Sequence, residues 1–107
     1  MTTITVTDRS RGEIIAQAEL DKGVFGFEGN YYFDPDLVLM DHLVVTNRVY
    51  ICPYKGRALW IDLQTNGGTI IKDVAWVYPD PKPGYTQIRG KIGFYDGTRA
   101  GTITKRV

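Results

Sequence analysis

The sequence predicts an all-β protein, a small antiparallel β-sandwich or open barrel with at most one short helical turn. Apolar and polar residues alternate in several short runs, and glycine, asparagine, aspartate and proline separate these runs. No apolar pattern in the sequence repeats with the period of a helix. The 107 residues are expected to form one domain, since a chain of this length buries roughly two-thirds of its unfolded surface.

The first half of the chain is expected to form short strands and one helical turn. Alternation and turn residues predict strands at residues 4–7, 14–20, 24–28 and 31–33. Asp34 can accept backbone N–H groups at a helix start, and Pro35 suits the first helical position, so one turn is predicted there. Beyond it, residues 37–45 are apolar enough for a buried strand.

The second half predicts a hairpin, with strands at residues 57–63 and 69–78 and a turn at Asn66-Gly67-Gly68. Period-two alternation divides the side chains of each strand between two faces. In the first strand one face carries Ala58, Trp60 and Asp62, and the other carries Leu59, Ile61 and Leu63. In the second strand one face carries Val74, Trp76 and Tyr78, and the other carries Asp73, Ala75 and Val77.

The end of the chain predicts a proline-rich excursion followed by two more strands. Residues 79–84 contain Pro79, Pro81 and Pro83. Proline cannot donate to a strand ladder, so this segment is expected to be exposed. Residues 88–95 and 102–104 are the last predicted strands.

The composition argues against several classes of partner. Thirteen basic and twelve acidic side chains nearly cancel, so we expect no nucleic acid and no membrane as partner. The first residues resemble no signal peptide, and no apolar stretch is long enough to span a bilayer. The single cysteine cannot form an internal disulfide, which agrees with a reducing compartment. We expect a cytoplasmic protein that is a monomer or homodimer.

Chemically useful side chains are densest between residues 52 and 79. The candidates for chemistry in this segment are a thiol, an amine, two carboxylates and three large aromatic side chains, namely Cys52, Lys55, Asp62, Asp73, Trp60, Trp76 and Tyr78. The candidate ligand-binding residues are Tyr32, Lys55, Trp60, Asp62, Asp73, Trp76, Tyr78 and Arg89. The aromatic residues either belong to the core or form the walls of a pocket for a planar or cationic ligand.

Cys52, Lys55 and Asp62 are the candidate catalytic residues. Cys52 is either a buried small hydrophobe or a thiol whose pKa is lowered by Lys55. The ammonium of Lys55 could meet a ligand carboxylate or phosphate, or pair with Asp62 or Asp73. A carboxylate among aromatic residues is costly unless it is paired, so Asp62 faces either solvent or a polar cleft.

The sequence predicts neither a metal nor a cofactor. Asp62 and Asp73 alone make a weak cation site, and no glycine-rich phosphate loop accompanies Lys55. His42 is the only histidine and is assigned no catalytic role.

The motifs of this chain resemble those of the bacterial domain-of-unknown-function family 427. They comprise Cys52 to Gly56, Ala58, Asp62, and residues 73–79, 88–90 and 93–95, with residues 31–33 and 41–43 upstream. The resemblance is strongest over residues 12–97. Asp96 to Arg99 replaces the usual family ending.

The resemblance implies a β-tent, the architecture of methionine sulfoxide reductase B and of the thalidomide-binding domain of cereblon. In that architecture two sheets pinned at one edge open to leave a ligand cleft. The paired zinc-binding cysteines of the wider group are absent from this sequence, so neither a structural zinc nor reductase chemistry carries over. The family also bears a nucleotidyltransferase label, for which the sequence offers no motif.

Two functions follow from these observations. The first is a small-molecule-binding module with an aromatic-walled polar cleft and a ligand of unknown identity. The second is an enzyme that uses Cys52 or Lys55 as nucleophile or acid–base group, and the family label would make it nucleotide-related. Binding requires fewer converging groups than nucleophilic catalysis, so we favour the first.

Overall fold

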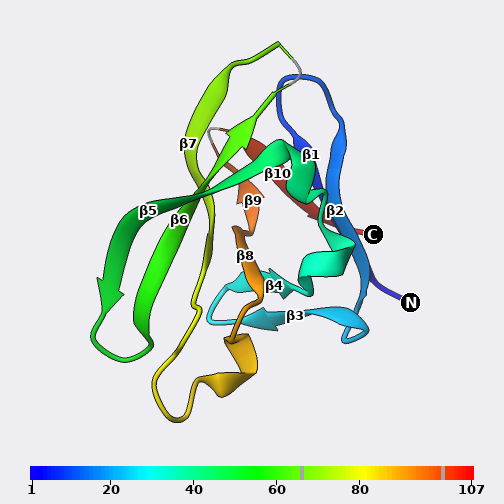
Figure 1. The fold of residues 1–107 in the computed structure, drawn as a ribbon. Coiled ribbons are helices and arrows are strands. Elements are labelled where there is room, and N and C mark those ends of the chain that lie inside the picture. Colours follow the sequence, from blue (N-terminus) through cyan, green and yellow to red (C-terminus); the bar gives the residue numbers. More distant parts are fainter. Residues whose placement is uncertain (66, 100) are drawn as a thin grey trace.

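The protein folds as one curled, mixed β-sheet that forms a half-barrel (Figure 1). The computed structural model describes residues 1–65, 67–99 and 101–107. The strands are β1 (Thr3–Asp8), β2 (Ile14–Leu20), β3 (Gly23–Phe27), β4 (Asn30–Phe33), β5 (Leu43–Cys52), β6 (Gly56–Gln64), β7 (Ile70–Val77), β8 (Ile92–Tyr95), β9 (Gly97–Thr98) and β10 (Thr102–Arg106). Their order is β5-β6-β7-β8-β4-β3-β2-β1-β10-β9. The all-β prediction is confirmed.

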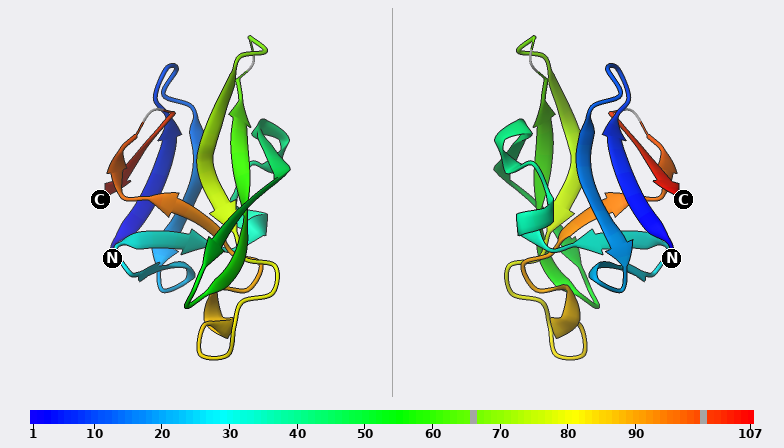
Figure 2. Two further views of the ribbon diagram at one scale, coloured as in Figure 1. Left: turned by 90° about the vertical axis from the view of Figure 1, so that its left-hand side faces the viewer. Right: turned by 90° about the vertical axis from the view of Figure 1, so that its right-hand side faces the viewer.

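The sheet has two walls joined by a floor. Figure 2 shows β5, β6 and β7 on one side and β1, β2 and β10 on the other, with β3, β4 and β8 crossing between them. Adjacent strands are antiparallel except β2 and β3, which are parallel. The main core fills the curl and includes Ile4, Val6, Ile15, Phe33, Ile61, Leu63 and Phe94. A single sheet therefore encloses the core that a sandwich would bury between two.

The predicted hairpins are present. β1 pairs with β2, and β6 pairs with β7. Of the turn predicted between β6 and β7, Asn66 lies outside the described residues. The predicted last strand is β10, which pairs with β1 and so joins the two ends of the chain.

Helical structure in the described residues consists of three single 3-10 turns, two more than predicted. These are η1 (Pro35–Leu37), η2 (Met40–His42) and η3 (Thr86–Ile88). Pro35 begins η1 as predicted, but the Asp34 side chain caps no backbone N–H group. Its carboxylate pairs with the ammonium of Lys91 instead.

The prediction of a buried strand over residues 37–45 is wrong. Val38 forms a single bridge to Ala16, and the chain then turns through η2 before β5 begins at Leu43. Leu37 and Leu39 are 40% and 47% exposed. An apolar segment becomes a strand only where a neighbouring strand offers a free edge along its length. Here the neighbouring strand β2 pairs with this segment at one residue only, Val38.

The strand predicted over residues 88–95 begins later than expected, at Ile92. The proline-rich excursion continues into η3, and the N–H of Gly90 donates to the carbonyl of Tyr78 at 3.0 Å. This bond closes the excursion into a loop that projects beyond the ends of β6 and β7 (Figure 1). Most of the loop is exposed as predicted, but Pro81 is buried.

The predicted faces of β7 hold for Trp76 and Tyr78 but not for Val74 and Asp73. Val74 belongs to the main core, whereas Trp76 and Tyr78 belong to a second apolar cluster. Beyond the end of its pairing with β8, the side chain of Val74 packs against Gly101. Asp73 adopts φ +60°, which interrupts the alternation of the strand. Its side chain therefore does not join the buried face that holds Ala75.

Two irregularities flank the middle of β6 and bring three charged residues together. The pairing of β5 with β6 shifts its register between Val45 and Val49 of β5. The pairing of β7 with β6 shifts its register opposite residues 61–63 of β6. Arg48 of β5 thereby reaches the carboxylate of Asp62, and its Nη2 donates to Oδ1 of Asp73 at 2.7 Å. The backbone N–H of Asp73 also donates to Asp62, at 3.0 Å. Asp62 is thus a buried, paired carboxylate.

Arg48→Met should lower the free energy of unfolding at neutral pH, because it leaves the buried carboxylate of Asp62 without its counter-charge. Burial raises the pKa of Asp62, but the guanidinium of Arg48 and the N–H of Asp73 outweigh it and hold the pKa below the ordinary 3.8. A carboxylate whose pKa is lower in the folded than in the unfolded protein stabilises the fold at pH values above its ordinary pKa. This stabilisation is lost as the pH falls through the pKa of the folded state. The deficit of the variant should therefore shrink below pH 3.8.

Urea denaturation at a series of pH values measures this deficit. Arg57→Met is the matched control, because Arg57 is exposed on β6 and forms none of the ion pairs found among the described residues. A deficit that stays constant down to pH 2 would contradict the assignment.

Candidate functional site

One lateral row of residues crosses five strands and carries most of the candidate site. The register pairs Trp60 of β6 with Trp76 of β7, and Trp76 with Gly93 of β8. Gly93 pairs in turn with Tyr32 of β4, and Tyr32 with Phe25 of β3. The row therefore has an aromatic residue at every position except the central one.

The glycine at the centre of the row is required by the neighbouring indole. A Cβ atom on Gly93 would lie 2.4 Å from Nε1 of Trp76, well inside contact distance. The indole therefore lies across β8 and reaches β4, where its N–H donates to the hydroxyl of Tyr32 at 3.1 Å. This bond links the wall of the sheet to its floor through side chains.

The aromatic residues of this face surround a pocket of about 300 Å³. Ring centroids are 6.3 Å apart for Trp60 and Trp76, and 4.8 Å apart for Trp76 and Tyr95. Tyr50 of the edge strand β5 lies 5.9 Å from Trp60. The pocket is lined by Asn30, Tyr32, Tyr50, Lys55, Ala58, Trp60, Trp76, Tyr78 and Tyr95.

The tip of the β5–β6 hairpin positions Lys55 in the pocket. The carbonyl of Lys55 accepts the N–H of Lys82 at 2.8 Å, and the ammonium of Lys82 donates to the carbonyl of Pro53 at 2.9 Å. The loop after β7 thus fixes the backbone on which Lys55 stands. The Lys55 ammonium pairs at 2.5 Å with Glu28 from the β3–β4 turn, not with Asp62 or Asp73.

The ionisable groups of the pocket keep their neutral-pH charge. Burial lowers the pKa of Lys55, but the bond to Glu28 outweighs it, so the pKa lies above its ordinary value. Burial raises the pKa of Tyr78 to about 12 and also raises that of Tyr32 and Tyr95. The pocket therefore presents one ammonium and neutral phenols near pH 7.

Cys52 is buried in the same apolar cluster but does not line the pocket. Burial raises the pKa of its thiol, while the backbone N–H groups of Lys55 and Tyr54 lower it, and the net result is below the ordinary value. The Lys55 N–H lies 3.4 Å from Sγ. The hairpin backbone, more than the lysine charge, therefore sets the thiol's acidity.

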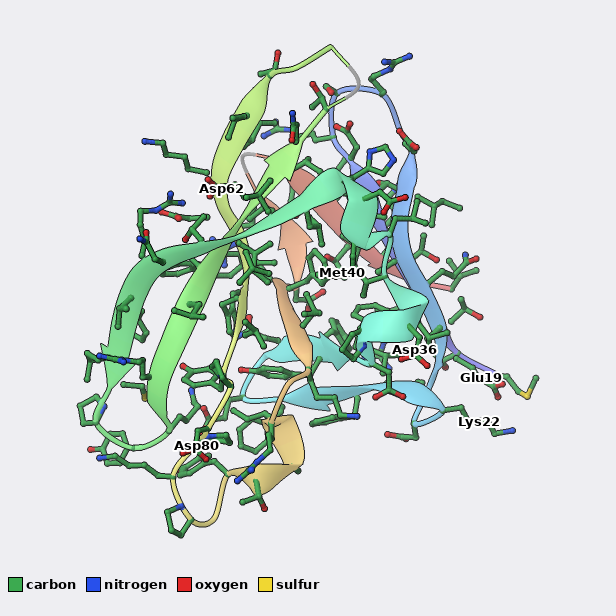
Figure 3. The ribbon with its side chains drawn as sticks, viewed as in Figure 1. Glu19, Lys22, Asp36, Met40, Asp62 and Asp80 are labelled. Atoms are coloured by element: carbon green, nitrogen blue, oxygen red, sulfur yellow. The ribbon has the colours of Figure 1, made fainter. Side chains whose placement is uncertain are left out.

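Three of the predicted binding residues lie away from the pocket. Asp62 and Asp73 are paired with Arg48, and Arg89 pairs with Asp80 at 3.2 Å on the exposed excursion. Figure 3 shows Asp62 part-way along the β6–β7 wall and Asp80 beyond its lower end. Tyr32, Lys55, Trp60, Trp76 and Tyr78 are the five predicted residues that line the pocket.

Sequence reasoning missed four lining residues, Asn30, Tyr50, Ala58 and Tyr95. Ala58 shares its predicted face with Trp60, so alternation alone could have included it. Tyr50 and Tyr95 come from strands whose neighbours the sequence does not reveal. Within the described residues, no group of three or more His, Cys, Asp and Glu residues could hold a metal ion. No helix in the same residues is long and apolar enough to cross a membrane.

These features define an all-β half-barrel with an aromatic pocket on the face opposite its main core. Residues 2–105 match the model of the domain of unknown function 427 (DUF427), whose short name also calls it a nucleotidyltransferase. The chain belongs to this family, as its motifs suggested. A comparison with curated proteins finds no match.

Gly93→Ala should destabilise the protein by about 1–3 kcal/mol, because the new methyl group displaces a tightly packed indole. The bond between Trp76 and Tyr32 should be lost with it. Urea denaturation, monitored by tryptophan fluorescence, measures the loss of stability. Loss of the bond should change the emission of the folded protein before urea is added.

Gly26→Ala is the matched control for this change. Gly26 also lies in a strand of the floor, but a Cβ atom there meets its nearest neighbour at 3.7 Å, an ordinary contact. Equal stability of the two variants would show that the indole does not depend on the glycine.

Proposed function

We propose that this protein is a binding module for a small planar molecule, which it holds between the aromatic side chains of the pocket. The observation that carries the proposal is the row of side chains from Trp60 to Tyr32, interrupted by Gly93. Aromatic side chains provide large, rigid surfaces that stack on planar ligands.

The dimensions of the pocket support a ligand of one or two rings. Its volume of about 300 Å³ is at the lower end of the range for small-molecule sites, ~300–1,000 Å³. Few polar groups accompany the rings, namely Asn30, Lys55 and the tyrosine hydroxyls. Such a combination gives affinity through stacking and orientation through a few directed contacts.

The geometry favours binding over catalysis. A lysine nucleophile needs a lowered pKa, and a cysteine nucleophile needs a base within hydrogen-bond reach and access to substrate. The pKa of Lys55 is raised, and Cys52 lies outside the lining with 7% of its surface exposed. The free thiol agrees with the cytoplasmic location that we also propose.

Native mass spectrometry of gently purified protein tests the proposal. We expect a mass excess that disappears on denaturation, or one that appears after incubation with a set of planar heterocycles. Trp60→Ala should abolish the excess with a modest loss of stability, because Trp60 is only partly buried. Trp76→Ala should abolish it and also cost about 3–5 kcal/mol of stability.

Tyr54→Ala serves as the control, since Tyr54 is 73% exposed and lies outside the pocket. An excess that survives in Trp60→Ala would place the site elsewhere. Loss of the excess in Cys52→Ala alone would favour the thiol-based alternative.

A further inference from the structure

The charge of the pocket is confined to one residue. Among the described residues that line it, Lys55 is the only one with a formal charge. The other polar groups are an amide, two indole N–H groups and phenol hydroxyls. A ligand that brings a single negative charge can therefore pair with this ammonium, whereas a cationic ligand finds no anionic residue among those that line the pocket.

The anion that now meets Lys55 comes from outside the pocket. Glu28 belongs to the β3–β4 turn and does not line the cavity. Its side chain is 46% exposed, whereas that of Lys55 is 18% exposed. Glu28 also has φ +53°, in the left-handed region that a side chain rarely adopts. Glu28 is thus an exposed residue in an unfavourable conformation that neutralises a largely buried ammonium.

Release of Glu28 would cost little if another anion took its place. A buried ammonium without a counter-charge is costly, but an exchange of one carboxylate for another keeps the ion pair. The carboxylate of Glu28 would then return fully to water. The outcome of the exchange therefore depends on which carboxylate, that of Glu28 or that of the ligand, forms the stronger contacts with Lys55 and its neighbours.

Two further hydroxyl donors, on Tyr32 and Tyr78, line the pocket together with Lys55. The hydroxyl of Tyr32 accepts the Trp76 N–H, which leaves its own hydrogen free to donate. The hydroxyl of Tyr78 has no hydrogen-bond partner recorded among the described residues. Burial raises the pKa of both phenols and the nearby charge of Lys55 partly offsets it, which agrees with hydroxyls that face the ammonium.

We propose that the pocket takes a planar aromatic monocarboxylate, whose carboxylate replaces that of Glu28 on the ammonium of Lys55. This inference rests on the proposed function and adds the class of ligand to it. The rings of Trp60 and Trp76 hold the aromatic part, while Lys55, Tyr32 and Tyr78 donate to the carboxylate. Glu28 is then a built-in competitor that occupies the anion position of the empty pocket.

Matched pairs of acids and amides test the inference. The probes are benzoate with benzamide, 2-naphthoate with 2-naphthamide, and indole-3-carboxylate with indole-3-carboxamide. Members of a pair share ring and shape and differ in charge. Isothermal titration calorimetry measures the affinities, because the naphthalene and indole probes themselves absorb and emit light in the range of tryptophan. We expect at least one acid to bind about tenfold more tightly than its amide, as charge-assisted hydrogen bonds imply.

Three variants separate the roles of the charges. Lys55→Met should remove the preference for the acid, because it weakens acid binding much more than amide binding. Glu28→Gln should tighten acid binding by several-fold, because the charged competitor is gone, and should change amide binding much less. Asp80→Asn is the control for net charge, since this carboxylate is 87% exposed and pairs with Arg89 at the same end of the molecule.

Each outcome bears on the inference. Equal affinities for acid and amide in the unchanged protein would overturn it and leave the binding module intact. Weaker acid binding in Glu28→Gln would overturn the exchange, because Glu28 would then assist the ligand. If Asp80→Asn and Glu28→Gln increase the affinity for the acid equally, the increase reflects the net charge of the protein. This result would also overturn the exchange. Absence of binding by every probe would reject both the inference and the proposed planar ligand.

Discussion

The indole of Trp76 is the contact on which both the pocket and its surroundings depend. It crosses the backbone of Gly93, donates to the hydroxyl of Tyr32 and contacts the rings of Trp60 and Tyr95. One side chain therefore joins four strands on the face opposite the main core. Because the residue at the centre of the row has no side chain, the row becomes a continuous aromatic surface.

Charged residues have two separate functions in this small fold. Arg48, Asp62 and Asp73 form a closed set, in which each carboxylate meets the same guanidinium. Their charges serve the structure of β6 and its neighbours. Lys55 and Glu28 form an open set, since one partner lines the pocket and the other lies on an exposed turn. The second set is the one that we propose a ligand to enter.

Local patterns predicted most of the strands, but they were wrong about a strand over residues 37–45 and about the faces of Asp73 and Val74. The missed features arise from long-range contacts. Alternation placed Trp60, Trp76 and Tyr78 correctly, because period two is a property of a strand alone. The role of Asp62 was not predictable, since its partner Arg48 reaches it through a register shift. Likewise, nothing local indicates that Glu28, on another hairpin, would neutralise Lys55.

The irregularity at Arg48 also affects how the molecule meets other molecules. β5 lies at the edge of the sheet and exposes Val44, Val45, Val49, Tyr50 and Ile51. A long, regular and apolar edge is a template for strand addition and for aggregation. Here the register shift between Val45 and Val49 interrupts the edge and divides it into two shorter stretches. The irregularity that brings Arg48 to Asp62 therefore also interrupts the apolar edge of β5.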